Sequence, residues 1–218
     1  YDASIPHGGP IISWEWDFDD GNTSNLQNPV HLYGSDGLYN VTLIVTSING
    51  CSDTITIPYE IYPLPDAGFT VLSACEGDPV IFTDTSVANG GVIISWEWDF
   101  GDGLGASNLQ NPTYIYGDTG TYWVTLIIIN SNGCTDTVMQ PVSYLPRPIA
   151  DFISDTSCAG SPVNFTDLTD PNGSILSTWE WDFGDGNTSN LQNPSHIYAG
   201  SGNYTVTLIV TNTSGCSD

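Results

Sequence analysis

Positively charged side chains are almost absent from this chain of 218 residues. It has no lysine, a single arginine (Arg147) and 25 acidic residues, so its formal net charge is -24. Nucleic-acid binding is excluded because it needs lysine and arginine to neutralise phosphates. Docking on an anionic membrane surface is excluded for the same reason. Without lysine, Schiff-base chemistry and a phosphate-binding P-loop are excluded as well.

Long apolar runs are also lacking. None approaches the roughly 18–20 residues of a membrane-spanning helix, so no membrane insertion is expected. The chain has neither an initiator methionine nor a signal peptide, and we expect it to be a processed or partly observed segment. Its hydrophobic content of 39% is enough for packed cores. The excess of negative charge makes a divalent cation, calcium, the first ligand to consider.

Three copies of one unit make up the sequence. The string S-W-E-W-D-F at 13–18 recurs at 95–100, and W-E-W-D-F recurs at 179–183. The period of 82–83 residues suits a small β domain with its own core. We therefore divide the chain into a first repeat (1–62) that lacks its first strands, a complete second repeat (63–145) and a third repeat (146–218) that lacks its last strand.

Alternation of apolar and polar residues predicts the strands of the second repeat at 67–73, 80–86, 92–100, 121–130 and 136–144. Glycine, asparagine and aspartate separate these segments, as at 101–103 and 132–133. No helical period appears, so the fold class is all-β, an antiparallel sandwich of about seven strands. Proline-rich joints at 62–65 and 145–148 are stiff, which predicts that successive sandwiches form a rod.

One family resembles the repeat closely. The strings W-x-W-D-F-G-D-G, S-x-x-x-N-P-x-H-x-Y and G-x-Y-x-V-T-L resemble the PKD (polycystic kidney disease) domain. The resemblance implies tandem immunoglobulin-like β-sandwiches, an extracellular setting, a role in spacing or adhesion, and no catalytic residues. Acidic tandem copies are similar to those of large bacterial surface proteins, including gliding-type adhesins. The first copy departs from the pattern at Asp19, where the other copies have Gly101 and Gly184.

Five cysteines occupy two repeat positions. Cys75 and Cys158 are equivalent early positions, and Cys51, Cys134 and Cys216 are equivalent late ones. One early and one late cysteine per repeat predict the disulfides Cys75–Cys134 and Cys158–Cys216, with the partner of Cys51 upstream of Tyr1. Disulfides indicate an oxidising, extracellular location. The alternatives are buried free thiols and, less favoured because no C-x-x-C pair exists, a zinc site.

Clustered aspartates follow the tryptophan strand of each repeat. We interpret them as hairpin turns in which carboxylates accept backbone N–H bonds. The alternative is a calcium site, since calcium binds several oxygen ligands from a flexible loop. No other cofactor is expected, and none is required by the turn interpretation. The candidate ligands are Asp17, Asp19, Asp20, Asp99, Asp102, Asp182 and Asp185.

Catalysis is not expected. Paired carboxylates could serve a glycosidase, but these recur at one turn of every repeat without a unique cleft. His31 and His196 share a position that Tyr114 fills in the second repeat, so they are interpreted as packing residues rather than general bases. The central tryptophan of each repeat is expected in the core, with carbohydrate stacking as the alternative.

Outward-facing apolar residues form a further candidate site. They lie opposite the core set on the long strand of each repeat, and could make a lateral contact between identical chains in a fibril, or be covered by the repeat's own loops. These residues are Ile44, Trp123, Ile127 and Ile209.

Glycosylation is a last candidate feature. N-x-S/T sequons occur at Asn22, Asn40, Asn164, Asn172, Asn187, Asn203 and Asn212. The triplets beginning at Asp53 and Asp136 resemble O-glycosylation acceptors of gliding-type surface proteins, which points to Thr54 and Thr137.

The sequence thus predicts a non-enzymatic extracellular structural protein, a stalk, fibril or adhesin filament on a bacterial surface. Its expected partners are neighbouring repeats and identical chains. The alternatives are an accessory module of a secreted hydrolase that binds glycans or proteins, and a calcium-dependent adhesin.

Overall fold

Residues 1–7 and 9–218 are described by a computed structural model of the protein. The described residues form eighteen strands and no helix, so none of them belongs to a helix that could cross a membrane. Two compact units account for the chain: Tyr1–Ala67 with Ser86–Ser95 and Ile127–Thr137, and Gly68–Thr85 with Trp96–Leu126 and Val138–Asp218. The second repeat contributes residues to both units.

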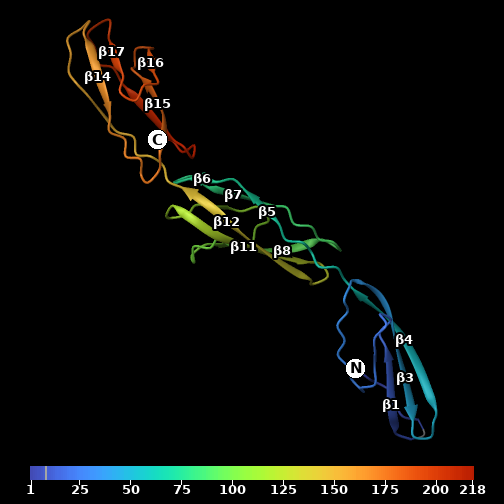
Figure 1. The fold of residues 1–218 in the computed structure, drawn as a ribbon. Coiled ribbons are helices and arrows are strands. Elements are labelled where there is room, and N and C mark those ends of the chain that lie inside the picture. Colours follow the sequence, from blue (N-terminus) through green and yellow to red (C-terminus); the bar gives the residue numbers. More distant parts are fainter. Residues whose placement is uncertain (8) are drawn as a thin grey trace. The chain divides into compact units, whose positions relative to one another are not determined.

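The first repeat forms one sheet with the strand order β2-β1-β3-β4, of which Figure 1 labels β1, β3 and β4. Its strands are β1 (Ile11–Asp17), β2 (Thr23–Ser24), β3 (Gly37–Ser47) and β4 (Ser52–Ile61). Trp16 lies opposite Leu43 in the antiparallel register of β1 and β3. Ile55 and Ile57 of β4 are each 55% exposed, because no second sheet covers this face among the described residues. Trp16 is therefore only half-buried.

The second repeat is a two-sheet sandwich. Its sheets have the orders β10-β7-β5 and β6-β12-β11-β8-β9. The strands are β5 (Phe69–Val71), β6 (Ala74–Cys75), β7 (Val80–Asp84), β8 (Ile93–Asp99), β9 (Ala106–Ser107), β10 (Thr113–Tyr114), β11 (Gly120–Asn130) and β12 (Thr135–Leu145). All five strand segments expected from alternation are confirmed.

One pairing in this repeat departs from the antiparallel expectation. After β5 pairs with β7 in one sheet, the chain crosses to the other sheet, where β6 runs parallel to the end of β12. Ala74 lies opposite Tyr144, and Cys75 lies opposite Leu145. This switch between sheets carries Cys75 to the end of the second repeat that adjoins the third.

The third repeat has two three-stranded sheets, β13-β14-β17 and β16-β15-β18. Its strands are β13 (Phe152–Ser154), β14 (Pro162–Asp167), β15 (Leu176–Asp182), β16 (Thr188–Ser189), β17 (Ser195–Ile197) and β18 (Thr207–Asn212). Trp179 lies opposite Val210 and Trp181 opposite Leu208 across β15 and β18.

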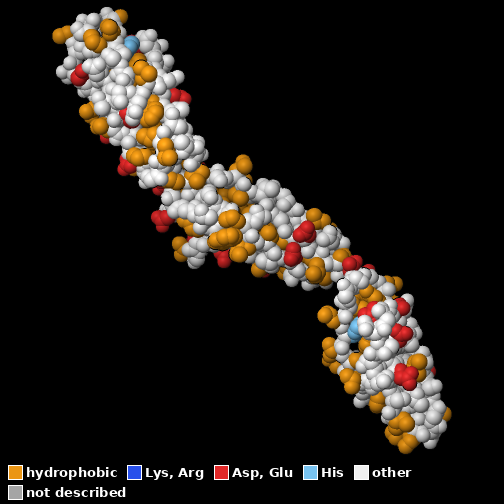
Figure 2. All heavy atoms as spheres, in the orientation of Figure 1, with side chains coloured by type: hydrophobic (Ala, Val, Ile, Leu, Met, Phe, Trp, Pro, Cys, Tyr) orange, Lys and Arg blue, Asp and Glu red, His pale blue; other side chains and the backbone are white. Residues whose placement is uncertain are grey.

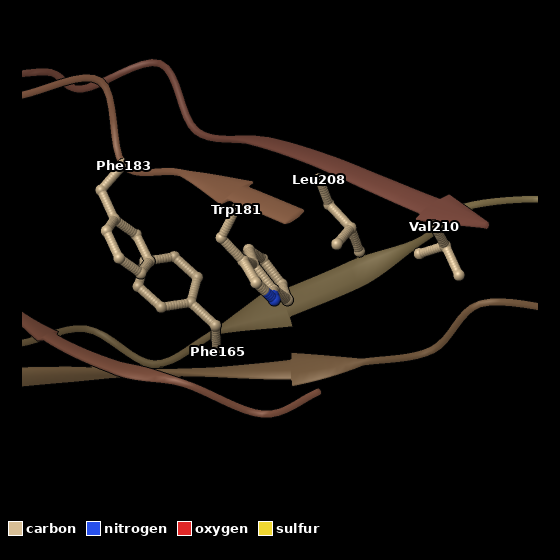
Figure 3. Close-up of a cluster of buried hydrophobic side chains, with 5 residues drawn as sticks. All are labelled: Phe165, Trp181, Phe183, Leu208 and Val210. Atoms are coloured by element: carbon tan, nitrogen blue, oxygen red, sulfur yellow. The ribbon is translucent and has the colours of Figure 1, made fainter. Parts of the chain in front are cut away.

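Aromatic side chains fill the core between the two sheets. Figure 3 shows Trp181 pointing from β15 toward Phe165 of β14, with Phe183, Leu208 and Val210 around them. Trp181 is 2% exposed, and its indole Nε1 donates to the Leu191 carbonyl oxygen at 2.9 Å. Trp98 is buried to the same extent in the second repeat. The core placement expected for these two tryptophans is confirmed.

Truncating the core should destabilise the third repeat. Phe165 is 3% exposed and packs on both Trp181 and Phe183, so Phe165→Ala should lower the free energy of unfolding of this sandwich by about 3–5 kcal/mol. Denaturant unfolding followed by tryptophan fluorescence measures the change. Leu191→Ala, which removes a side chain that is 66% exposed, is the control and should change stability by less than about 0.5 kcal/mol. Equal effects of the two substitutions would contradict the packing shown here.

Candidate functional site

The first aspartate of each acidic turn caps the backbone of the turn. In the second and third repeats the Oδ1 atoms of Asp99 and Asp182 accept hydrogen bonds from the backbone N–H groups of Gly101 and Gly184 at 2.9 and 2.8 Å. Asp17 accepts the equivalent bond from Asp19 at 3.0 Å. The three turns therefore use their first carboxylate in the same way, as the turn interpretation expects.

Two features of this turn favour glycine in the second repeat. Gly101 has φ +79°, and a Cβ there would overlap the backbone carbonyl oxygen of Trp123. Asp19 occupies the position in the first repeat with φ 65°. Its carboxylate accepts the backbone N–H of Asn40 at 2.8 Å, the residue equivalent to Trp123. The aspartate that replaces glycine in the first repeat thus makes a hydrogen bond across the turn.

The next aspartate of the turn holds an aromatic ring. Asp20 and Asp185 accept a hydrogen bond from Nε2 of His31 and His196, each at 2.7 Å. The rings stack on the phenylalanine of the turn, with centroids 4.0 and 4.3 Å apart. Because an ionised carboxylate only accepts, Nε2 carries the proton. The hydrogen bond from His196 is the main cause that keeps the pKa of Asp185 below its ordinary value.

Tyrosine replaces histidine in the second repeat and keeps the same contacts. The Tyr114 hydroxyl donates to Asp102 at 2.5 Å, and its ring stacks on Phe100 at 4.2 Å. This hydrogen bond, with burial, raises the pKa of Tyr114 to about 12. This position of the repeat therefore needs a planar ring that can donate a hydrogen bond. Histidine and tyrosine both meet this requirement. A packing role accounts for both.

A second acidic network recurs in every repeat, and the sequence interpretation missed it. Asp167 Oδ2 accepts from Trp179 Nε1 at 2.8 Å and from Gln192 Nε2 at 3.0 Å. Its backbone N–H donates to Asn193 Oδ1 at 2.9 Å. The equivalent sets are Asp84, Trp96, Gln110 and Asn111, and Asp2, Trp14, Gln27 and Asn28. The signal was the constant L-Q-N-P string, whose glutamine and asparagine tie a loop to a strand.

Calcium binding at the acidic turns stays a prediction. Among residues 1–7 and 9–218 no group of three or more histidine, cysteine, aspartate or glutamate side chains is arranged to hold a metal ion. On the face drawn in Figure 2 the acidic side chains form separate spots rather than one patch. The turn carboxylates already accept bonds from backbone N–H groups, as at Asp102 from Leu104 and Gly105.

The disulfide pairing expected from the repeats is wrong. The structure bonds Cys75 to Cys216, with 5.6 Å between their Cα atoms, and leaves Cys51, Cys134 and Cys158 as free thiols. Cys75 lies beside the last residue of β12, whereas Cys134 precedes the first. Eleven residues of strand separate the two by about 36 Å, and a disulfide needs Cα atoms within about 7 Å. Cys216 is already bonded, so Cys158–Cys216 does not form either.

Polar side chains hold the joint between the second and third repeats, which this disulfide also spans. The Arg147 guanidinium, the single cationic side chain of the sequence, lies 2.7 Å from Asp78. Asn172 Nδ2 donates to the Arg147 carbonyl oxygen at 3.0 Å, from a backbone with φ 47° that asparagine tolerates. Asn212 Nδ2 donates to the Pro146 carbonyl oxygen at 2.9 Å. The proline joint is therefore held by side chains from the third repeat.

The candidate lateral-contact residues differ in exposure. Trp123 and Ile209 are 56% and 42% exposed, whereas Ile44 and Ile127 are half-buried. Their use as a contact between chains stays a prediction.

Most of the candidate glycosylation sites are exposed, but one is not. Asn212 is 2% exposed, and its side chain bonds Pro146, Ser214 and Cys216, so the folded chain has no room for a sugar there. The prediction of a glycosylation site at Asn212 is therefore wrong for the folded state. The exposed candidates are Asn22, Asn40, Asn164, Asn172, Asn187, Asn203, Thr54 and Thr137.

Comparison with known proteins gives one family. The PKD domain family matches residues 1–61, 62–143 and 145–218. The chain is 47% identical over 53 residues to a microbial collagenase of Vibrio alginolyticus, which covers 24% of this chain and 6% of that protein. It is 32% identical over 141 residues to the pre-pro-metalloprotease PrtV of Vibrio cholerae, covering 62% of this chain and 15% of PrtV.

A solved structure of the PKD1 domain of the Vibrio cholerae metalloprotease PrtV is similar to part of the chain. The identity is 35% and the TM-score 0.35, with 38% of this chain and 99% of that domain covered. The chain thus spans a small fraction of the full-length relatives that it matches.

Removing the ring that holds the acidic turn should change the titration of its carboxylate. His196→Ala should raise the pKa of Asp185 toward its ordinary value of 3.8, because the bond from Nε2 is lost. A depressed carboxyl pKa stabilises the folded state above the ordinary value, and this contribution is lost as the pH falls through the folded value. The variant should therefore be less stable than the parent near neutral pH, and the difference should narrow in acid without vanishing, because the stacking of the ring on Phe183 is lost at every pH.

Carboxyl NMR titration of Asp185 measures the shift. His7→Ala, which changes an exposed histidine outside the turn, is the control and should leave the Asp185 titration where it is. A titration that stays the same in His196→Ala would show that the histidine does not set it.

Proposed function

Because the chain belongs to the PKD domain family, we propose that it is a non-catalytic array of extracellular modules that spaces and positions other parts of a larger protein. One observation carries the proposal. The recurrent acidic, histidine, tyrosine and glutamine side chains hold the loops of each sandwich, as in the set around Asp167 and in the pair of Asp185 with His196. Loop anchoring is enough to explain why these side chains recur in every repeat, so no catalytic role is needed for them.

The setting follows from the chemistry of the cysteines. A disulfide persists outside the reducing cytosol, and the bond between Cys75 and Cys216 supports an extracellular location. The acidic surface keeps such a chain soluble, since its like charges repel one another. Both features suit a segment exposed to the medium.

The names of the relatives favour one kind of extracellular protein over another. They carry the names collagenase and metalloprotease, which supports an accessory segment of a secreted hydrolase over the stalk or fibril of a bacterial surface. The fibril, the calcium-dependent adhesin and the lateral contact remain proposals with less support.

A spacer should be long for its mass. Three repeats placed end to end, each about the length of an 11-residue strand, would give a maximum dimension of about 110 Å. Small-angle X-ray scattering measures this, and a compact 218-residue protein would have a radius of gyration of about 17 Å. A compact particle would contradict the spacer, and a mass that rises with concentration would instead support association of identical chains.

Binding to an insoluble polymer is the second candidate function, and Trp123 is the observation that favours it. Its side chain is 56% exposed on β11, and exposed tryptophan can stack on sugars or pack on proteins. The chain should then sediment with insoluble collagen or glycan, and Trp123→Ala should lose most of this binding. Leu104→Ala, at a residue 92% exposed in the same repeat, is the control. Failure of the parent chain to sediment with any such polymer would end this candidate.

A further inference from the structure

The disulfide joins two different repeats. Cys75 ends β6 in the second repeat, and Cys216 follows β18 in the third, 141 residues later in the chain. Immunoglobulin-like sandwiches are commonly stapled by a disulfide between their own two sheets. Here the bond lies instead at the joint between sandwiches.

The bond is built into the joint from both sides. Cys216 is fully buried, and its backbone N–H donates to Asn212 Oδ1 at 3.0 Å. On the other side the backbone N–H of Glu76 donates to the Leu145 carbonyl oxygen at 2.8 Å, which extends the pairing of β6 with β12 past Cys75. The salt bridge from Arg147 to Asp78 lies on the same segment. Ordered backbone therefore presents each sulfur to the other.

The covalent connection changes which residues bear a load. Tension applied at Tyr1 and Asp218 runs along residues 1–75, crosses the disulfide and leaves through residues 216–218, so residues 76–215 lie on a closed loop outside the force path. That loop holds the core strands β7, β8, β11 and β12 and all strands of the third repeat. Hydrogen bonds and apolar contacts break at a far lower applied force than a covalent bond does.

We propose that Cys75–Cys216 is a covalent bridge that carries tension past residues 76–215, which hold most strands of the second sandwich and all strands of the third, and keeps these strands out of the force path. The proposal deepens the spacer role and rests on it, since a spacer that transmits tension needs a fixed length. Reduction of the bond by an external thiol, which is oxidised to its own disulfide as Cys75 and Cys216 become thiols, would return residues 76–215 to the force path. The length of the chain under load would then depend on the redox state of its surroundings.

The repeat positions of the remaining cysteines agree with this pairing rule. An early cysteine of one repeat bonds the late cysteine of the repeat that follows. Within the 218 residues, Cys75 and Cys216 are the one pair that meets this condition. The rule accounts for the thiols of Cys51, Cys134 and Cys158, which occupy the same two positions but have no such counterpart in this sequence.

Peptide mapping tests the connectivity. The oxidised chain is alkylated, digested without reductant and analysed by mass spectrometry. We expect one crosslinked peptide pair containing Cys75 and Cys216, and alkylated peptides for the other three cysteines. Recovery of Cys75 with Cys134, or of Cys158 with Cys216, would overturn the proposal.

Single-molecule stretching of the folded chain tests the load path. Without reductant only residues 1–75 and 216–218, 78 in all, can extend, to about 280 Å at about 3.6 Å per residue. A thiol reductant should release residues 76–215 and lengthen the chain by about 500 Å, a gain of about 2.8-fold in total.

Two variants distinguish the bridge from a staple within one repeat. Cys75→Ser should extend to the full length without reductant, whereas Cys134→Ser should keep the short length of the parent. A longer extension in Cys134→Ser, or the same extension of the parent with and without reductant, would overturn the bridge. Because the parent can be folded first and then reduced, the test does not depend on how well Cys75→Ser folds. Scattering tests the spacer separately, so either proposal can fail alone.

Discussion

Packing of a tryptophan from one sheet against phenylalanines from the other is the interaction on which the complete sandwiches depend. Trp98 meets Phe69 and Phe82 with ring centroids 5.1 and 5.4 Å apart, and Trp181 meets its counterparts in the third repeat at nearly the same separations. The first repeat shows what happens without the facing sheet. Trp16 is half-buried there, and Tyr59 of β4 is 58% exposed, whereas its counterpart Val142 on β12 is buried.

The polar networks follow from this core rather than from a reaction. Once two sheets are packed, the loops between their strands must be held, and their backbone N–H groups need acceptors. Short carboxylates and amides supply these acceptors, which is why aspartate, asparagine and glutamine recur at the same positions in every copy. The acidic character of the chain is in part a consequence of this use, multiplied by three repeats. The other acidic side chains face solvent.

The disulfide shows how one strand crossing can change the role of a residue. Had the first strand of the second repeat stayed in the sheet with β7, Cys75 would not reach the third repeat. The short pairing of Ala74 and Cys75 with the end of β12 places the sulfur at the joint instead. The same joint holds the Arg147 guanidinium, 2.7 Å from Asp78.

The sequence by itself determined the repeats, the strands and the aromatic core, because alternation along a strand records which face is buried. It also identified the turns, since glycine and aspartate at fixed spacing have few other structural uses. The partner of Cys75 and the burial of Asn212 were decided only by the tertiary structure. Each depends on which strand end lies beside which, and the spacing of residues within one repeat does not contain that information. A contact between two repeats is set by packing across their joint, so it became visible only once both sandwiches were in place.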